Sequence, residues 1–170
     1  MIAALVVLVL AAPPEPADVV RGHYAQVQAA LSSGDKAAIA RRVVGAIDAL
    51  LDFPTFGAAT LPGRWAAMTP RDRERFLAAF RALVERQFVE RLASDRDVVL
   101  AVGKSQNPKR VHTTVSGRRN AFDLDLLFEG GRVVDLFIDG QSQADGYARA
   151  FERTLRSRGL DGLIEKMARP

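Results

Sequence analysis

Apolar residues recur at helical spacing through the first half of the chain and at alternating positions further on. Val20, Tyr24, Val27 and Leu31 stand three or four residues apart, a spacing that indicates one buried face of a helix. Ser32-Ser33-Gly34 follows and is typical of a helix end. The pattern predicts helices at 17–31, from the capping residue Asp35 to about 51, from 52–54 to a stop at 61–63, and at 70–93.

The fourth helix has the strongest start signal in the chain. Thr69 can accept a hydrogen bond from a free backbone N–H, and Pro70 fits the first helical position. Asp72 favours the positive end of the helix. One apolar stripe then follows the helix, formed by Phe76, Phe80, Leu83, Val84, Phe88 and Leu92.

The hydrophobic period changes to two in the region that follows. Phe122, Leu124, Leu126 and Phe128 alternate with Asp123 and Asp125, which predicts a strand with one buried face. Four strands are predicted, at 97–102, 110–116, 121–128 and 132–138. Because turn residues separate them, we expect an antiparallel meander with one face buried.

Helices close the sequence. Ser142 and Asp145 have the spacing of a capping box, which predicts a helix to about 158, a stop at Gly159 and a last helix at 161–168. The order of elements predicts an α+β domain. It has a helix-rich N-terminal half, a four-stranded curved antiparallel sheet and C-terminal helices that cover the sheet.

The N-terminal segment has the features of an export signal. The apolar stretch 2–10 spans roughly 15 Å as a helix, about half of a bilayer core. Ala11-Ala12 and a Pro-rich stretch follow it, although no basic residue precedes it. We therefore expect a signal peptide at 1–12, one mature domain at 13–170 and a periplasmic location.

Composition excludes several classes of function. The chain has 170 residues, of which 48% are apolar, enough to build one core. Its net charge is +4, and no run of five basic residues or alternation of basic with aromatic residues is present, so nucleic acid is not an expected partner. The absence of cysteine excludes disulfides and thiolate chemistry.

Candidate catalytic groups are few. His23 and His112 have no second histidine at metal-ligand spacing, and no nucleophile elbow or phosphate-binding loop is present. His112 with Asp123 or Asp125 is the best acid–base pair that the sequence offers, and a polar sheet face paired with Arg110 or Arg132 is the simpler reading. We expect a protein that is not an enzyme and has no metal or cofactor.

Aromatic residues gather in two segments, which leaves two structural interpretations open. Six of the twelve lie between Phe53 and Phe88, five lie between Phe122 and Phe151, and Tyr24 lies in the first predicted helix. They could fill an ordinary core, or they could line an apolar cavity between the sheet and the helices. Periodicity alone does not separate these interpretations.

Two segments, 50–92 and 133–167, resemble the MlaC family of periplasmic phospholipid-binding proteins, also called the toluene-tolerance auxiliary family. In the first segment the resemblance is carried by Asp52-Phe53, Gly63, Trp65, Thr69-Pro70, Phe76 and Phe80. In the second it is carried by Asp135, Ile138, Gly140, Ser142, Tyr147, Phe151, Gly159, Asp161, Leu163 and Ile164. The chain departs from the family pattern in lacking an aromatic residue in Gly131-Arg132-Val133 and in having Ala148 directly after the tyrosine.

The resemblance implies a lipid shuttle with an apolar cavity between sheet and helices. Such a protein carries a phospholipid or other diacyl lipid between an outer-membrane lipoprotein complex and the inner-membrane MCE protein of an ABC transporter. A hopanoid or another apolar lipid is the alternative ligand. An exported interaction module with a solid core is the alternative function.

The same resemblance guides the choice of site residues. The expected lipid-binding residues are Phe53, Trp65, Phe80, Val84, Phe88, Leu124, Leu126, Leu136, Ile138, Tyr147 and Phe151. Arg64 and Arg149 are the expected head-group contacts, because a guanidinium can bind a phosphate.

Overall fold

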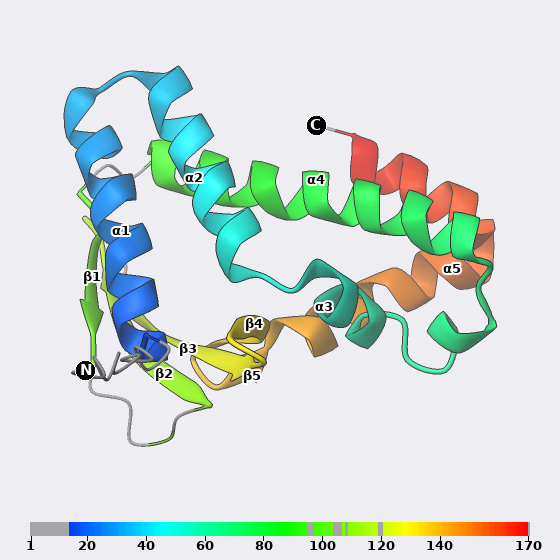
Figure 1. The fold of residues 1–170 in the computed structure, drawn as a ribbon. Helices are drawn as coiled ribbons and strands as arrows, with labels where there is room; N and C mark the ends of the chain where they lie inside the picture. Colours follow the sequence, from blue (N-terminus) through cyan, green and yellow to red (C-terminus); the bar gives the residue numbers. More distant parts are fainter. Residues whose placement is uncertain (1–13, 95–96, 104–106, 108, 119–120, 170) are drawn as a thin grey trace, which may run out of the picture.

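The computed structural model describes residues 14–94, 97–103, 107, 109–118 and 121–169, so the expected signal peptide lies outside the described residues. Helices come first, a sheet follows, and a long helix closes the fold (Figure 1). The helices are α1 (Pro16–Ser33), α2 (Lys36–Leu50), α3 (Phe53–Ala59), the 3-10 helix η1 (Trp65–Ala67), α4 (Pro70–Ser94) and α5 (Gln143–Ala168). The strands are β1 (Val99–Val102), β2 (Arg110–Ser116), β3 (Ala121–Glu129), β4 (Arg132–Ile138) and β5 (Gln141–Ser142).

This architecture confirms the predicted α+β class. The structure adds one short strand to the predicted four, because the two residues of β5 pair with the end of β4 before the last helix starts. A two-residue strand has no alternation of its own, so hydrophobic periodicity could not reveal it. None of the helices within the described residues combines the length and the hydropathy needed to cross a bilayer.

Side-chain caps set the helix starts at the predicted residues. The carboxylate of Asp35 accepts the Ala37 N–H, and the Thr69 hydroxyl accepts the Asp72 N–H at 3.1 Å. The Ser142 hydroxyl accepts the Asp145 N–H at 3.1 Å. Each contact satisfies a backbone donor that the first helical turn leaves without an internal partner.

The break that the sequence predicts between two C-terminal helical segments is present at Gly159. Gly159 interrupts α5 with φ 64° and ψ −168°, a conformation that is essentially restricted to glycine. The label α5 therefore covers two helical segments that meet at this bend, and the second segment ends at Ala168.

The sheet is an antiparallel meander in the order β1-β2-β3-β4-β5. Leu126 pairs with Val111 of β2 and with Leu136 of β4, and Leu124 pairs with Thr113 and with Ile138 in the same way. Paired residues of an antiparallel sheet project to the same face. This face, here called the inner face, carries Leu100, Val102, Val111, Thr113, Val115, Phe122, Leu124, Leu126, Leu136 and Ile138.

Helices cover the inner face unevenly. In Figure 1, α1 runs along β1 at the left and α4 crosses the top of the view, while α5 leaves β5 at the bottom and ends beside α4. The Tyr24 hydroxyl ties α1 to the sheet by accepting the Leu100 N–H at 2.7 Å. In contrast, α4 packs mainly against α2 and α5 rather than against the strands.

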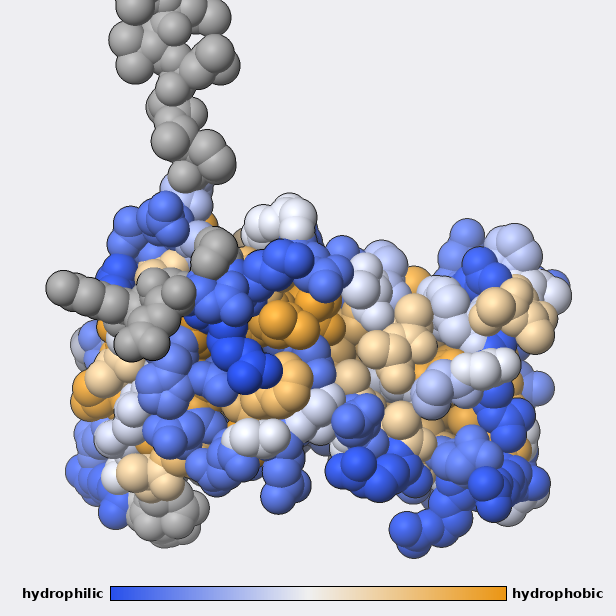
Figure 2. Space-filling model, turned by 90° about the horizontal axis from the view of Figure 1, so that it is seen from below, coloured by the Kyte–Doolittle hydropathy of each residue, from blue (hydrophilic) through white to orange (hydrophobic). Residues whose placement is uncertain are grey.

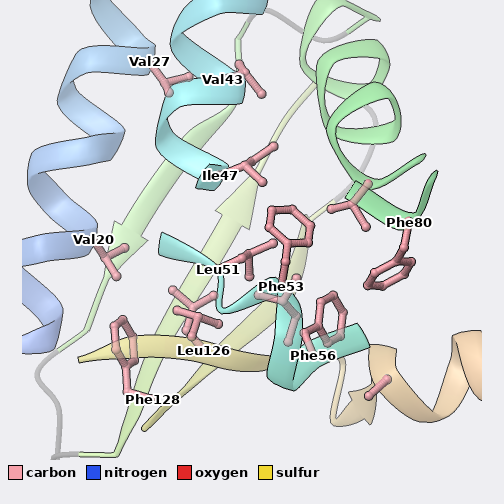
Figure 3. Close-up of a cluster of buried hydrophobic side chains, with 14 of the residues drawn as sticks. Val20, Val27, Val43, Ile47, Leu51, Phe53, Phe56, Phe80, Leu126 and Phe128 are labelled. Carbon is pink, nitrogen blue, oxygen red and sulfur yellow. The ribbon is translucent and has the colours of Figure 1, made fainter. Parts of the chain in front are cut away.

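The segment between α2 and α3 is attached to β4 through the backbone. The Asp52 N–H donates to the Val133 carbonyl at 2.8 Å. Arg132 donates from its guanidinium to the carbonyls of Asp48 and Leu51 at the end of α2. These contacts place Leu51 in the core, where Figure 3 shows it near Leu126 and Phe53.

Replacing Gly159 with alanine tests the bend in α5. Since the φ of Gly159 is positive, we expect Gly159→Ala to lower the free energy of unfolding by about 1–3 kcal/mol, measured by urea denaturation. Gly146→Ala is the matched control, because Gly146 lies in the helical part of α5 and a Cβ there meets no atom within 4 Å. The control should raise stability by about 0.4–1 kcal/mol. Equal effects of the two substitutions would contradict the bend.

Candidate functional site

Phe80 is the centre of an aromatic cluster that joins α3, α4 and α5. Its ring lies 5.2–6.4 Å, centroid to centroid, from five others. These are the rings of Phe53, Phe56, Phe76, Tyr147 and Phe151. Figure 3 shows Phe53, Phe56 and Phe80 pointing toward one another, and all three are almost fully buried. Ring packing therefore fills the interior between these helices.

Burial varies along the inner face of the sheet: Thr113 and Val115 of β2 are buried, although they pair with the half-buried Leu124 and Phe122 of β3. Val111, Leu126 and Leu136 are buried, whereas Leu124 and Ile138 are only half-buried although they project from the same face. Phe122, two residues before Leu124, is half-buried as well. Phe122, Leu124 and Ile138 are called the apolar patch below.

The surface view is consistent with this uneven covering. Figure 2 shows apolar side chains gathered in the middle of the lower face of the molecule, with polar side chains on both sides. In Figure 1 the lower side of the molecule is formed by β2 and β3 at the left, by β4 and β5 in the middle, and by α3 and the start of α5 further right. Apolar side chains are thus accessible to solvent on this face of the molecule.

Side chains of α4 and α5 lie between the aromatic cluster and the patch. The Tyr147 hydroxyl of α5 donates to the Gln87 side-chain oxygen of α4. One turn further along α4, the Arg91 guanidinium carbon lies 5.9 Å from the centroid of the Phe122 ring. Phe88, from the same part of α4, is half-buried against the core. Side chains rather than packed backbones therefore join α4 to this edge of the sheet.

Tyr147 lies between the aromatic cluster and the side chain of Gln87 on α4. Its ring contacts Phe80 and Phe56 on one side, and its hydroxyl reaches Gln87 on the other. Burial raises the pKa of Tyr147 to about 12, and the positive charge of Arg91 acts in the opposite direction. The phenol is therefore neutral at any physiological pH and acts as a hydrogen-bond donor.

Arg64 and Arg149 come together in a different place. They line a surface pocket of about 640 Å³ between α5 and the loop that follows α3, together with Glu152. Arg64 forms an ion pair with Glu152 at 3.4 Å, and hydrogen bonds from Arg156 and Arg64 lower the pKa of that carboxyl group. No residue of the apolar patch lines this pocket. The expected head-group residues thus share a site, but the expected lipid-binding residues lie elsewhere.

The remaining expected lipid-binding residues divide between the core and its edges. Val84 of α4 is buried in the core, with Leu126 and Leu136 of the sheet. Trp65 is half-buried, stands edge-on to Phe76 and lies beneath the guanidinium of Arg73. The set therefore combines residues that are fully packed with residues that are accessible to a ligand.

The acid–base pair that the sequence offered does form, on the outer face of the sheet. The Nδ1 of His112 lies 2.7 Å from Asp125 Oδ1, and its Nε2 lies 3.8 Å from Asp123. Arg110 also reaches Asp125, at 3.8 Å, as the alternative of a paired polar face predicts. Arg132 does not join this face and binds the carbonyls at the end of α2 instead. Among the described residues, no group of three or more His, Asp or Glu side chains is arranged to hold a metal ion.

Gln87, Arg91 and Phe122 are not among the binding residues that the sequence predicts, although Phe122 is one of the aromatic residues that could line a cavity. Gln87 and Arg91 are four residues apart and off the apolar stripe of their helix, which is also the pattern of an ordinary solvated face. Phe122 looks like any other residue of an alternating strand. The contact between Arg91 and Phe122 depends on how α4 lies relative to β3, and no local sequence pattern determines that arrangement.

Comparison with known proteins adds a family and a fold. The family model described as MlaC protein matches residues 22–169. Among solved structures, a phospholipid-binding protein from Ralstonia solanacearum in complex with a phospholipid is similar, with a TM-score of 0.73 and 20% sequence identity. The match covers 91% of this chain and 95% of that chain. No curated protein sequence matches significantly.

Titration of Tyr147 tests its burial. The chain has two tyrosines, so in a Tyr24→Phe variant the phenolate absorbance reports Tyr147 alone. We expect a midpoint near 12 for the folded protein, above the ordinary value of about 10. Because the folded-state pKa is the higher one, stability from this group is present below pH 10 and is lost as pH rises from about 10 to 12. A midpoint near 10 while circular dichroism still shows native structure would contradict the buried position.

Proposed function

Because the chain belongs to the MlaC family, we propose that it binds a phospholipid, with the acyl chains against the apolar patch. The half-buried inner face at Phe122, Leu124 and Ile138 is the observation that carries the proposal. Support comes from the similar fold of the phospholipid-binding protein from Ralstonia solanacearum, which was solved with a phospholipid.

Burial of apolar surface can supply the binding free energy, so this function needs no catalytic step. Each buried methylene contributes about 0.8 kcal/mol, so a chain of about sixteen carbons gains roughly 12 kcal/mol before the costs of ordering. The apolar patch offers such a chain an apolar surface to pack against, and the head group can stay in water. Both the family and its phospholipid-binding relative point to a binding protein rather than an enzyme.

The interior must make room for the acyl chains beside a packed core. Side chains, not backbone packing, join α4 to the edge of the sheet at Tyr147–Gln87 and at Arg91–Phe122. Rotation of a few side chains is a far smaller change than separation of two packed elements, since it leaves the helix ladders and the sheet intact. We infer that the lipid enters between α4 and the apolar patch of the sheet.

The wider role is proposed from the family. The protein is exported to the periplasm, the segment 1–12 acts as its signal peptide, and it carries phospholipid between an outer-membrane lipoprotein complex and the MCE protein of an inner-membrane ABC transporter. Such a carrier needs a ligand that is held by burial alone, so that either complex can remove it without a chemical step. A hopanoid is the alternative cargo, because the patch recognises apolar area rather than a particular chain.

Substitutions on the two faces of β3 test the binding surface. Leu124→Gln puts an amide into the apolar patch, and we expect it to reduce the lipid that co-purifies from a bacterial periplasm by roughly tenfold, because a polar group without a partner opposes burial of the chain. The amount is measured by mass spectrometry of an organic extract. Leu127→Gln is the matched control, since Leu127 is also half-buried on β3 but pairs with Asp135 on the opposite face.

The pattern of outcomes separates the alternatives. Diacyl lipid in the wild type and in Leu127→Gln but not in Leu124→Gln supports the proposal. If a hopanoid co-purifies with the wild type and with Leu127→Gln but not with Leu124→Gln, the proposed binding surface stands and only the cargo differs. Equal lipid in both variants places the ligand elsewhere, and folded, detergent-free wild type without lipid supports the interaction module with a solid core.

A further inference from the structure

A groove runs along α5, away from the apolar patch. The pocket at Arg64 and Arg149 is followed by a neighbouring hollow of about 390 Å³. The two hollows share four lining residues, which are Leu61, Gly63, Arg64 and Leu155. They therefore form one continuous groove between α5 and the segment 60–68, here called the α5 groove.

Both walls of the α5 groove are held in place by contacts behind them. At η1, the Arg73 guanidinium donates to the carbonyls of Trp65 and Ala66 at 3.1 and 3.0 Å and lies over the Trp65 ring. On the other side, Phe151 anchors α5 in the aromatic cluster. The groove is therefore preformed, and a partner would not have to order its walls at a cost in binding free energy.

The α5 groove combines an apolar lining with positive charge at one end. Its half-buried apolar side chains are Met68, Leu155 and Leu160. Arg149 is exposed, and within the described part of the chain it has neither a hydrogen-bond nor an ion-pair partner. Arg64 pairs with Glu152, but Arg156 also contacts that carboxylate at 2.7 Å, so two guanidinium groups share one carboxylate. Positive charge is therefore in excess beside apolar surface.

This combination selects an acidic protein segment as the occupant. An inorganic anion would meet Arg64 and Arg149 but would leave the apolar lining beyond them uncovered. A lipid on the apolar patch would not cover the groove, because no residue of the patch lines it. A second copy of this chain, with its net charge of +4, and the segment 1–13, which has no acidic residue, lack the complementary charge. A segment that carries both apolar and acidic side chains matches both features of the groove.

We propose that the α5 groove is the docking surface for an acidic, partly apolar segment of a membrane protein with which the carrier exchanges its lipid. This inference rests on the proposed carrier role, and it adds the surface that meets the partner and the chemistry of the partner's segment. Apolar side chains of the segment lie against Met68, Leu155 and Leu160, and its carboxylates pair with Arg64 and Arg149. Docking and lipid binding thus use different residues, so a loaded protein can dock.

Binding to the two proposed partners tests the docking surface. The mature protein, purified natively, is titrated by biolayer interferometry against the periplasmic domain of the MCE protein and against the outer-membrane lipoprotein, both from the same bacterium. We expect one of them to bind, and Arg149→Glu to weaken that binding roughly tenfold or more, because repulsion replaces attraction. Higher ionic strength should weaken the wild-type complex as well. Arg41→Glu is the matched control, since Arg41 is exposed on α2, lines neither hollow and changes the net charge equally.

A second pair of variants tests the apolar end of the groove. Ala67→Glu puts a carboxylate into the groove, and we expect it to weaken binding at least as much as Arg149→Glu does. Ala66→Glu is its control, because Ala66 is also exposed in η1 but lines neither hollow. The two substitutions make the same change of charge on neighbouring residues, so a difference between them reports the groove itself.

Binding weakened by Arg149→Glu and Ala67→Glu, but not by Arg41→Glu and Ala66→Glu, supports the inference. Equal weakening within either pair, or no weakening, overturns it. A concentration-dependent dimer of the wild type that Arg149→Glu abolishes makes a second copy the occupant, which also overturns it.

Lipid extracted from the same samples separates this inference from the proposed function. Loss of lipid in Arg149→Glu would make the groove a head-group site and overturn the docking surface. A wild type that retains lipid but binds neither membrane protein overturns the docking surface and the carrier role and leaves lipid binding intact. A wild type that docks through the groove but carries no lipid overturns the lipid-binding proposal alone.

Discussion

Packing of aromatic rings around Phe80 is the interaction on which the rest of the structure depends. The five neighbouring rings come from α3, from α4 and from the start of α5, so one side chain joins α5 to two helices that lie far from it in the sequence. Edge-to-face contacts of this kind add directional energy to the burial of large apolar area. The cluster fixes α4 in position without close packing against the strands.

The carboxylate of Asp135 holds together the junction between β4 and α5. Asp135 accepts hydrogen bonds from the Ser142 hydroxyl at 2.6 Å and from the Ala144 N–H at 3.0 Å, so it binds the first turn of α5 to the strand that precedes it. Asp139 and Gly140, both with positive φ, make the turn between them. Tyr147 then lies one turn into the helix, with its ring in the Phe80 cluster and its hydroxyl toward Gln87.

A packed core excludes solvent, whereas an accessible apolar face leaves apolar side chains in contact with solvent. In this fold the two lie in different places. Rigid ring packing supplies stability at the helix end, where Phe76 and Phe80 are fully buried. On the sheet, Leu124 and Ile138 are only half-buried. The proposed lipid binding and the folding of the chain thus use the same hydrophobic effect on different residues.

The sequence by itself determined the elements and their order, because hydrophobic period, capping residues and turn residues are local properties. It assigned the inner face of β3 correctly, placed the helix starts at Thr69 and Ser142, and supplied the family motifs. Only the tertiary structure decided that Phe53 and Phe80 pack in a filled cluster, that Arg64 and Arg149 share a pocket away from the patch, and that Arg91 lies over Phe122. These outcomes depend on distances between segments that periodicity does not encode: whether two rings touch or line a space is set by how far apart their helices lie.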